Sequence, residues 1–89
     1  MLISVYIPTY NRPERLRKAV DSVLAQSYKP VELIVVNDGK ALPQDLVSYL
    51  AEKSVTLLKT AGQEGACVAR NIAINQAKGE YITGLDDDD

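Results

Sequence analysis

The sequence predicts an α/β fold in which a mostly parallel sheet carries helices on both faces. Short apolar runs alternate with segments of helical periodicity in the order β-α-β-α-β-α-β, and the connections between them are short. One run is apolar almost throughout, which is typical of a strand buried on both faces of a parallel sheet. With right-handed crossovers this is half of a doubly wound fold, and we expect the strand order 3-2-1-4.

The first strand is expected over Leu2–Ile7, a run with β-branched residues. Asn11 is expected to be the N-cap of the first helix, with Pro13 in its first turn and Glu14 as capping-box partner. Pro30 is expected to end this helix. Its apolar stripe consists of Leu16, Ala19, Val20, Val23 and Leu24.

The middle of the chain continues the alternation. Val31–Val36 is the nearly continuous apolar run and is predicted to be the second strand. The residues 37–39 (Asn-Asp-Gly) are a turn signal. A second helix is predicted over Pro43–Lys53, and a third strand over Val55–Leu58.

The last third adds one helix and one strand. Gly62–Gly65 is expected to open the third helix and Gly79 to terminate it. Its expected packing face consists of Ala66, Ala69, Ile72, Ala73 and Ala77. Tyr81–Leu85 is predicted to be a fourth strand, and Asp86–Asp89 follow it at once. In a complete domain this strand would lie inside the sheet, whereas in these 89 residues its outer edge is expected to lack a partner. An α/β domain rarely finishes there, so we expect a piece of a longer chain.

Composition excludes several classes of protein. The chain has 89 residues, of which 46% are hydrophobic and 25% charged, so it is neither disordered, collagen-like nor a coiled coil. No apolar run is as long as a membrane span, and Met1–Ile7 is too short for a signal peptide. We therefore expect a soluble, cytoplasmic protein. Attachment of the full-length protein at the inner membrane face stays open as an alternative.

The missing residue types limit the chemistry. Histidine is absent and Cys67 is the only cysteine, which excludes a Ser-His-Asp triad, a His-ligated zinc and an internal disulfide. We expect Cys67 to be a packed core thiol. Any metal must be held by oxygen ligands, which favours magnesium, manganese or calcium. The formal charge of −2 is concentrated in the final aspartates, and no basic stripe indicates a nucleic acid partner.

Polar residues collect directly after the predicted strands. In an open α/β sheet, ligands bind outside the carboxyl ends of the strands, where the strand order reverses. The loop of residues 8–12 after the first strand and the acidic run after the fourth are therefore expected to face each other across one crevice. The candidate residues in these positions are Pro8, Thr9, Tyr10, Asn11, Arg12, Asn37, Asp38 and Asp86–Asp89.

Each candidate has a functional and a structural interpretation. Tyr10 stacks on a nucleobase or packs against the first helix. Asp38 accepts a hydrogen bond from a base or ribose, or only forms a turn. Arg12 and Arg70 contact phosphate or are merely solvated. The acidic run binds a divalent ion with a diphosphate, or is a solvated tail. The glycines before the third helix leave its amides open to an anion, although the pattern is not a phosphate-binding motif.

Five segments together resemble the N-terminal, nucleotide-binding half of a family 2 glycosyltransferase with the GT-A fold. They occur in family order and at family spacing across essentially the whole chain. The segments are residues 4–12 (SVYIPTYNR), 22–28 (SVLAQSY), 32–39 (ELIVVNDG), 69–71 (ARN) and 77–82 (AKGEYI), the last running on into Leu85 and the aspartates.

The resemblance implies inverting transfer of a sugar from a nucleotide-diphosphate donor, with UDP as the expected nucleotide, to an acceptor hydroxyl. It implies that Tyr10 stacks on the base, that Asp38 recognises the base and that Arg70 lines the donor site. The acidic run is similar to the family's DxD motif, with a register ambiguous by one residue. Asp86 and Asp88 are then the candidates for binding Mn or Mg, Asp88 most directly. Asp86 or Asp87 contacts ribose or metal-bound water.

The sequence also departs from the family's pattern. Asn37 stands where the family often has Asp, Lys40 where Ser is common, and Gln63 where Asn is frequent. The catalytic base and acceptor part lie in the family's C-terminal half, which is absent here. We therefore expect residues 1–89 to supply only the donor and metal site and to be inactive alone. The expected partners are a nucleotide-sugar donor, a glycan, lipid-linked or protein acceptor, and a second copy paired through an exposed sheet edge.

Three other functions stay open. A non-catalytic nucleotide-binding module would use the same crevice. A sugar-1-phosphate nucleotidyltransferase usually has a glycine-rich basic loop after the first strand, whereas Thr9–Arg12 has no glycine. A receiver-like signalling domain would have its acidic residues after the first and third strands, whereas here they follow the second and fourth.

Overall fold

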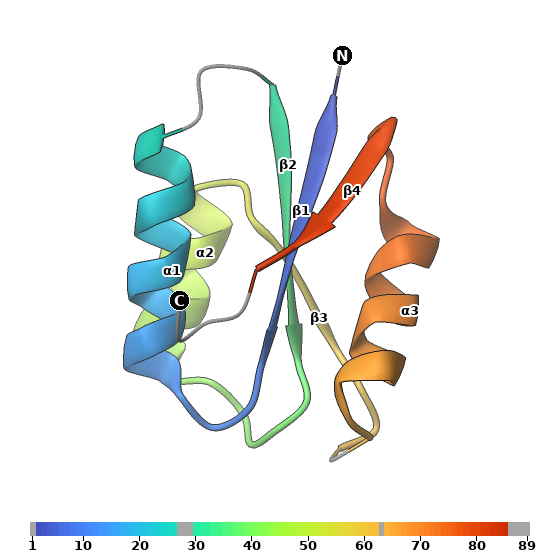
Figure 1. Cartoon of the computed structure of the whole chain (residues 1–89). Helices are drawn as coiled ribbons and strands as arrows, with labels where there is room; N and C mark the ends of the chain where they lie inside the picture. The colour runs from blue at the N-terminus through green and yellow to red at the C-terminus, as the bar shows by residue number, and fades with distance from the viewer. Residues whose placement is uncertain (1, 27–29, 63, 86–89) are drawn as a thin grey trace.

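The protein is described by a computed structural model that covers residues 2–26, 30–62 and 64–85. Its centre is a four-stranded sheet in the order β3-β2-β1-β4, and every pairing is parallel. This confirms the predicted fold class and strand order. The strands are β1 (Ile3–Thr9), β2 (Val31–Asn37), β3 (Thr56–Lys59) and β4 (Tyr81–Gly84) (Figure 1).

Helices cover both faces of the sheet, as the sequence predicts. The helices α1 (Pro13–Gln26) and α2 (Gln44–Glu52) lie on one face, and α3 (Ala66–Gln76) lies on the other (Figure 1). A receiver-like order would place β1 between β2 and β3. Here β3 pairs with the far side of β2, which excludes that alternative. Among the described residues, no helix is both long enough and apolar enough to cross a membrane.

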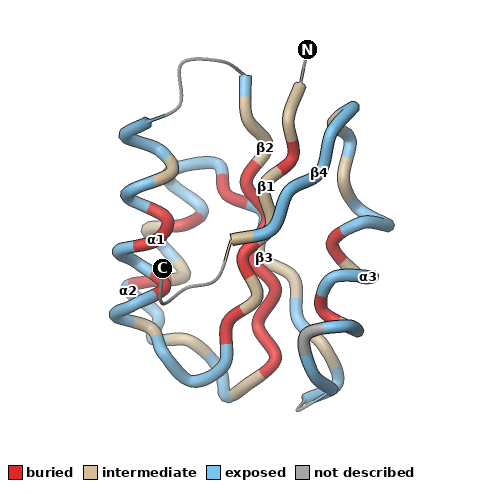
Figure 2. Tube along the Cα trace, viewed as in Figure 1, coloured by how far each residue is buried: buried red, intermediate tan, exposed pale blue. Residues whose placement is uncertain are grey.

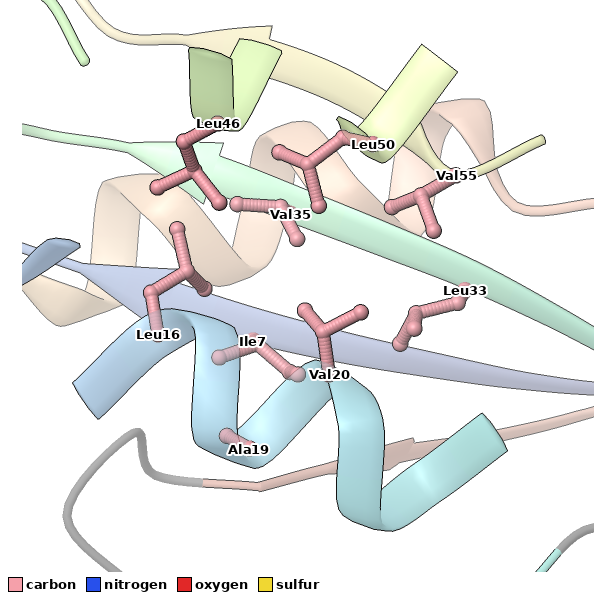
Figure 3. Close-up of a cluster of buried hydrophobic side chains, with 9 residues drawn as sticks. All are labelled: Ile7, Leu16, Ala19, Val20, Leu33, Val35, Leu46, Leu50 and Val55. Carbon is pink, nitrogen blue, oxygen red and sulfur yellow. The ribbon is translucent and has the colours of Figure 1, made fainter. Parts of the chain in front are cut away.

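The apolar second strand contributes side chains to two separate hydrophobic cores. Leu33 and Val35 point into the core under α1 and α2, whereas Ile34 and Val36 belong to the core under α3. Successive side chains of a strand point to opposite faces, so a strand covered on both sides needs apolar residues at every position. Figure 3 shows the larger core, whose buried members are Ile7, Leu16, Ala19, Val20, Leu33, Val35, Leu46, Leu50 and Val55.

The first strand extends two residues beyond its predicted end and includes Pro8. A proline lacks the N–H that a central strand must donate. Pairing of β1 with β4 covers only Ile3 to Tyr6, and the last backbone bond runs from Leu85 N to Tyr6 O at 3.0 Å. Among the described residues Pro8 is therefore paired on one side only, with Val36 of β2. The end of β1 is open on its β4 side, and a proline is tolerated there.

The prediction that Asn11 caps the first helix is wrong. The helix begins at Pro13, so Arg12 is the residue before it. Asn11 has a left-handed backbone with φ of 55°, which asparagine tolerates better than most residues. Its Oδ1 accepts the backbone N–H of Lys40 at 2.7 Å. Asn11 therefore ties the loop after β1 to the loop after β2.

The prediction that Gly79 terminates the third helix is also wrong. The helix ends at Gln76, and Ala77 is already extended. Gly79 instead lies against β1, where its N–H donates to Ser4 Oγ at 2.9 Å. A Cβ at this position would lie 2.5 Å from that oxygen, so the close approach of the two segments requires glycine.

The structure agrees with the exposed outer edge expected for the fourth strand and corrects one predicted burial. All four residues of β4 are exposed, because its outer side has no neighbouring strand among the described residues (Figure 2). Cys67 is exposed on α3, whose inward face is occupied by Ala69 and Ala73. The acidic run Asp86–Asp89 lies outside the described residues.

Candidate functional site

A pocket of about 180 Å³ lies at the carboxyl ends of β1 and β2, beside the start of α3. Five of the residues that the sequence singles out share it, and they come from two different strand ends. This is the edge of the sheet at which open α/β folds bind ligands. The lining residues are Pro8, Thr9, Tyr10, Arg12, Asp38, Gly65 and Ala69.

The loop after β1 contributes an aromatic and a cationic group to the pocket. The side chain of Tyr10 is 42% exposed although it lines the pocket, so part of its surface is accessible to a ligand. An aromatic ring in this position suits stacking against a planar base. Arg12 is exposed, and its guanidinium can donate two parallel hydrogen bonds to phosphate oxygens. The two side chains thus offer different chemistry to the two ends of a nucleotide.

Asp38 is the buried charged group of the pocket. Its Oδ1 accepts the hydroxyl of Thr60 and the backbone N–H of Glu64, the latter at 2.8 Å. Its Oδ2 accepts the backbone N–H of Gly65 at 2.9 Å. The Thr60 hydroxyl first, and then the two amides, hold the pKa of the Asp38 carboxyl below its ordinary value, although burial opposes them. The carboxylate is therefore ionised at neutral pH.

The amides before α3 bind an anion, but that anion belongs to the chain itself. The sequence indicates that the glycines here leave amides open to an anionic ligand. In the structure Glu64 and Gly65 give their N–H groups to Asp38 instead. Gly65, whose φ of 92° favours glycine, is the N-cap of the helix. A free phosphate at these two amides would have to displace a carboxylate already in place.

Three of the candidate residues within the described part of the chain, Asn11, Asn37 and Arg70, do not line the pocket. The Asn37 side chain instead donates to Lys40 O at 2.8 Å and accepts the N–H of Gly39 at 3.0 Å. Asn11 binds Lys40 N, and a Cβ on Gly39 would come within 2.3 Å of Asn11 Oδ1, so these two loops are pressed together. Asn11 thus has a structural role. Arg70 is exposed on α3, one residue after the lining residue Ala69.

Sequence reasoning did not identify Gly65 and Ala69 as lining residues. The signal for them was indirect, because Gly65 precedes a helix and Ala69 was assigned to that helix's packing face. Their small side chains leave the space between α3 and the strand ends unfilled.

The metal site stays a prediction. Asp86, Asp87 and Asp88, which the sequence assigns to metal and ribose, lie outside the described residues. Within residues 2–26, 30–62 and 64–85, no three His, Cys, Asp or Glu side chains are grouped so that they could hold a metal ion.

A larger hollow of about 490 Å³ lies between α1 and the start of α2. It is lined by both acidic and basic side chains, among them Glu14, Arg17, Asp21 and Asp45, so neither charge dominates. None of the described residues that line it belongs to a strand. We place the candidate site in the smaller pocket, because the polar residues from separate strand ends converge there.

Comparison with known proteins shows which family and which fold the chain resembles. The model of a family described as Glycosyl transferase family 2 matches residues 4–89. A curated relative from Escherichia coli K12, named "Putative colanic acid biosynthesis glycosyl transferase WcaA", is 44% identical over 91 residues. That alignment covers 99% of this chain and 33% of the relative. The chain thus spans about a third of the length of that relative.

Two solved structures share the fold and were determined with nucleotide sugars. The mannosyltransferase PcManGT from Pyrobaculum calidifontis, in complex with GDP-Man and Mn²⁺, superposes with a TM-score of 0.82 at 27% identity. The alignment covers 97% of this chain and 27% of that one. S. aureus TarS 1–349 in complex with UDP-GlcNAc superposes with a TM-score of 0.78 at 29% identity, covering 99% of this chain and 27% of the other.

Proposed function

The chain belongs to glycosyl transferase family 2, and from this membership we propose that it binds the nucleotide end of a UDP-sugar donor. The transfer we propose is inverting and directed to an acceptor hydroxyl. The observation that carries the proposal is the convergence of Tyr10, Arg12 and Asp38 in one pocket at the carboxyl edge of the sheet. The relatives that match the chain are glycosyltransferases, which favours a transferase over a nucleotidyltransferase.

The size of the pocket indicates which part of the donor it takes. Its volume of about 180 Å³ is below the range of roughly 300–1,000 Å³ typical of pockets that enclose a whole ligand. We propose that it holds the base, stacked against Tyr10, with the diphosphate outside it toward Arg12. The ionised Asp38 accepts hydrogen bonds and donates none, so it favours a base that presents an N–H at this edge, as uracil does. The UDP-GlcNAc complex of TarS supports a uridine donor, although the GDP-Man complex of PcManGT shows that the fold accepts guanosine as well.

The proposed metal ligands are the aspartates after β4, with Asp88 and Asp86 as the residues that hold Mn²⁺ or Mg²⁺. The described part of the chain fits this placement. The last backbone bond between β4 and β1 joins Leu85 N to Tyr6 O. Tyr6 lies three residues before Thr9, which lines the pocket, and three residues of a strand span about 10 Å. Carboxylate oxygens are the ligands that these ions prefer. A bound divalent ion would neutralise charge on the diphosphate leaving group. The Mn²⁺ in the PcManGT complex supports this cofactor.

The remaining parts of the reaction are assigned to no residue of this chain. We propose that the acceptor is a glycan, a lipid-linked sugar or a protein hydroxyl, and that a base outside residues 1–89 takes its proton. The relatives are about three times longer than this chain, which leaves room for such a part. We therefore expect the 89 residues alone to bind donor without transferring sugar.

Calorimetric titration of the protein in its natural length tests the donor proposal. We expect UDP to bind more tightly than GDP or dTDP, and to bind more weakly when the divalent metal is removed with a chelator. Tyr10→Ala should weaken UDP binding by roughly 5- to 150-fold, the range of base–aromatic stacking. Tyr81→Ala is the matched control, since Tyr81 is 62% exposed on the outer strand β4 and should leave affinity unchanged. Absence of binding by all three nucleotides, with and without metal, would refute the proposal.

A further inference from the structure

Thr60 is a residue that neither the sequence motifs nor the pocket lining singles out, yet it makes direct contact with the charged group of the site. It lies directly after β3, and its backbone N–H donates to Asn37 O at 3.1 Å. Its hydroxyl donates to Asp38 Oδ1 and accepts the N–H of Gly62 at 3.0 Å. Thr60 therefore joins the end of β2, the carboxylate of Asp38 and the loop that leads into α3.

The three bonds that the described residues make to the carboxylate are not shared equally between its oxygens. Oδ1 accepts two of them, from Thr60 and Glu64, whereas Oδ2 accepts one, from Gly65. Each carboxylate oxygen has about two acceptor positions. Counting only the bonds made by the described residues, both acceptor positions of Oδ1 are thus used, whereas one acceptor position of Oδ2 is not. Since Asp38 lines the pocket, Oδ2 is the oxygen that has acceptor capacity left for a ligand.

The loop around Thr60 is itself fixed, so the orientation of the hydroxyl is set by the chain. Gly62 N donates to the Thr60 oxygen, which directs the hydroxyl proton away from Gly62 and toward Asp38. Glu64 Oε2 accepts the N–H of Ala61 at 2.9 Å, which closes the loop from the other side. A valine would keep the shape of Thr60 and lose the donor. A serine would keep the donor.

We propose that Thr60 is a positioning residue of the donor site, which holds Asp38 so that Oδ2 alone is presented to the base. This rests on the proposed function, because the base is what Oδ2 would bind. Thr60 does not line the pocket and acts through Asp38. The prediction is specific to the hydroxyl, because valine keeps the methyl group without the hydroxyl and serine keeps the hydroxyl without the methyl group. The backbone bond to Asn37 is available in both variants.

The pKa of Asp38 is a measurable quantity that a loss of packing alone would not change. The Thr60 hydroxyl is the largest cause that lowers the pKa of Asp38, so its removal should raise that pKa toward the ordinary value. Among the described residues that line the pocket or bond Asp38, the other titratable or charged side chains are Tyr10, Arg12 and Glu64, and they are unchanged in the variant.

The test combines two measurements on the protein in its natural length, with Thr60→Val, Thr60→Ser and the control Thr56→Val. Thr56 is exposed at the other end of β3. The first measurement is the pH titration of the Asp38 carboxyl carbon by NMR without nucleotide. The second is calorimetric UDP affinity between pH 4 and 8. We expect Thr60→Val to titrate at higher pH and to bind UDP about tenfold more weakly. Thr60→Ser and Thr56→Val should match the parent in both.

The outcomes separate this proposal from the proposed function. If the parent binds UDP and Thr60→Val neither titrates nor binds differently, the role of Thr60 is refuted and the donor site stands. If Thr60→Ser fails to restore what Thr60→Val loses, the effect is one of packing and the proposal is refuted. If the parent binds no nucleoside diphosphate, the proposed function is refuted, and the NMR titration by itself decides whether Thr60 positions the carboxylate.

Discussion

The carboxylate of Asp38 joins three parts of the chain that are distant in sequence. Its donors lie 22, 26 and 27 residues further on, in the segment between β3 and α3. Its own backbone N–H donates to Thr9 O at 2.9 Å, which adds the end of β1. A charge-assisted hydrogen bond is about twice as strong as a neutral one. One residue thus holds together the strand end, the loop and the helix start that form the pocket.

Replacing Asp38 by Asn tests this role through pH. The pKa of Asp38 is lower in the folded chain than its ordinary 3.8, so its stabilising contribution is complete above that value. The contribution is lost as pH falls through the lowered pKa, because the protonated carboxyl no longer accepts these bonds as an anion. We expect Asp38→Asn to lower Tm by several degrees at pH 7, and the difference from the parent to shrink below about pH 3.8.

Thermal unfolding followed by circular dichroism from pH 2 to 7 measures this difference. Asp45→Asn is the control, since Asp45 is exposed in the first turn of α2 and should change Tm little at any pH. A Tm difference that is the same at every pH would mean that the charge of Asp38 does not stabilise the loop.

At the scale of elements, the register of the pairing between β1 and β4 determines where β4 ends. Four residue pairs join these strands, against seven between β1 and β2. A small network anchors this pairing: Ser4 Oγ donates to Glu32 Oε1, and both Lys78 N and Gly79 N donate to this pair, at distances of 2.8 to 2.9 Å. The network sets the register of β4 and therefore the point at which the acidic run begins.

Two glycine substitutions test whether the close contact of Gly79 with β1 stabilises the pairing of β1 with β4. In Gly79→Ala the new Cβ would meet the backbone, at 2.7 Å from Ser4 N and 2.9 Å from Leu2 O. In Gly84→Ala it would meet the ring end of Tyr6 at 2.6 Å, and that ring can turn away. We expect Gly79→Ala to lower the free energy of unfolding by about 1–3 kcal/mol, the usual cost of overpacking. Gly84→Ala should cost clearly less. Urea unfolding measures both, and equal losses would contradict the anchoring role of Gly79.

At the scale of the whole molecule, β4 forms one edge of the sheet and has no neighbouring strand on its outer side among the described residues. All four residues of β4 are exposed, and among them Tyr81 and Ile82 are 62% and 39% exposed (Figure 2). An edge strand with apolar side chains and unpaired backbone groups is a template for pairing with another chain. The curated relatives are longer than this chain, so this edge need not be open in a protein of their length.

We expect the 89-residue chain to self-associate through β4 at high concentration. Ile82→Lys should reduce the association, because a charged side chain on an edge strand opposes pairing. Ile74→Lys is the matched control: Ile74 is exposed to a similar extent, 44% against 39%, but lies on α3 rather than on the edge. Static light scattering over a concentration series measures both variants. A parent chain that is monomeric at every concentration would refute the prediction.

The fold was largely predictable because its signals are local. The period of the apolar residues distinguishes strands from helices over a few residues, and the run at Val31–Val36 indicates a strand covered on both faces. The predicted inward residues of the first helix are correct in its first half, where Leu16, Ala19 and Val20 are buried, whereas Leu24 near its end is 38% exposed. The strand order 3-2-1-4 was expected as one of the two common orders of doubly wound sheets, and no single residue determined it.

The candidate site was predicted in part, and the errors share one physical cause. Thr9, Tyr10 and Arg12 line the pocket because they lie at or just after the end of β1, whereas Asn11 between them does not line it. The roles of Asn11 and Gly79 were wrong because their partners, Lys40 and Ser4, are 29 and 75 residues away. A local motif cannot reveal a partner at that distance.

The amino-acid order alone therefore determined which segments are strands and helices, how they alternate and which strand ends carry polar groups. Only the tertiary structure decided what those polar groups bind. A side-chain oxygen takes the donors that packing brings to it, and for Asp38 these come from a loop that begins more than twenty residues later. Periodicity acts between neighbours in sequence, whereas hydrogen bonds act between neighbours in space.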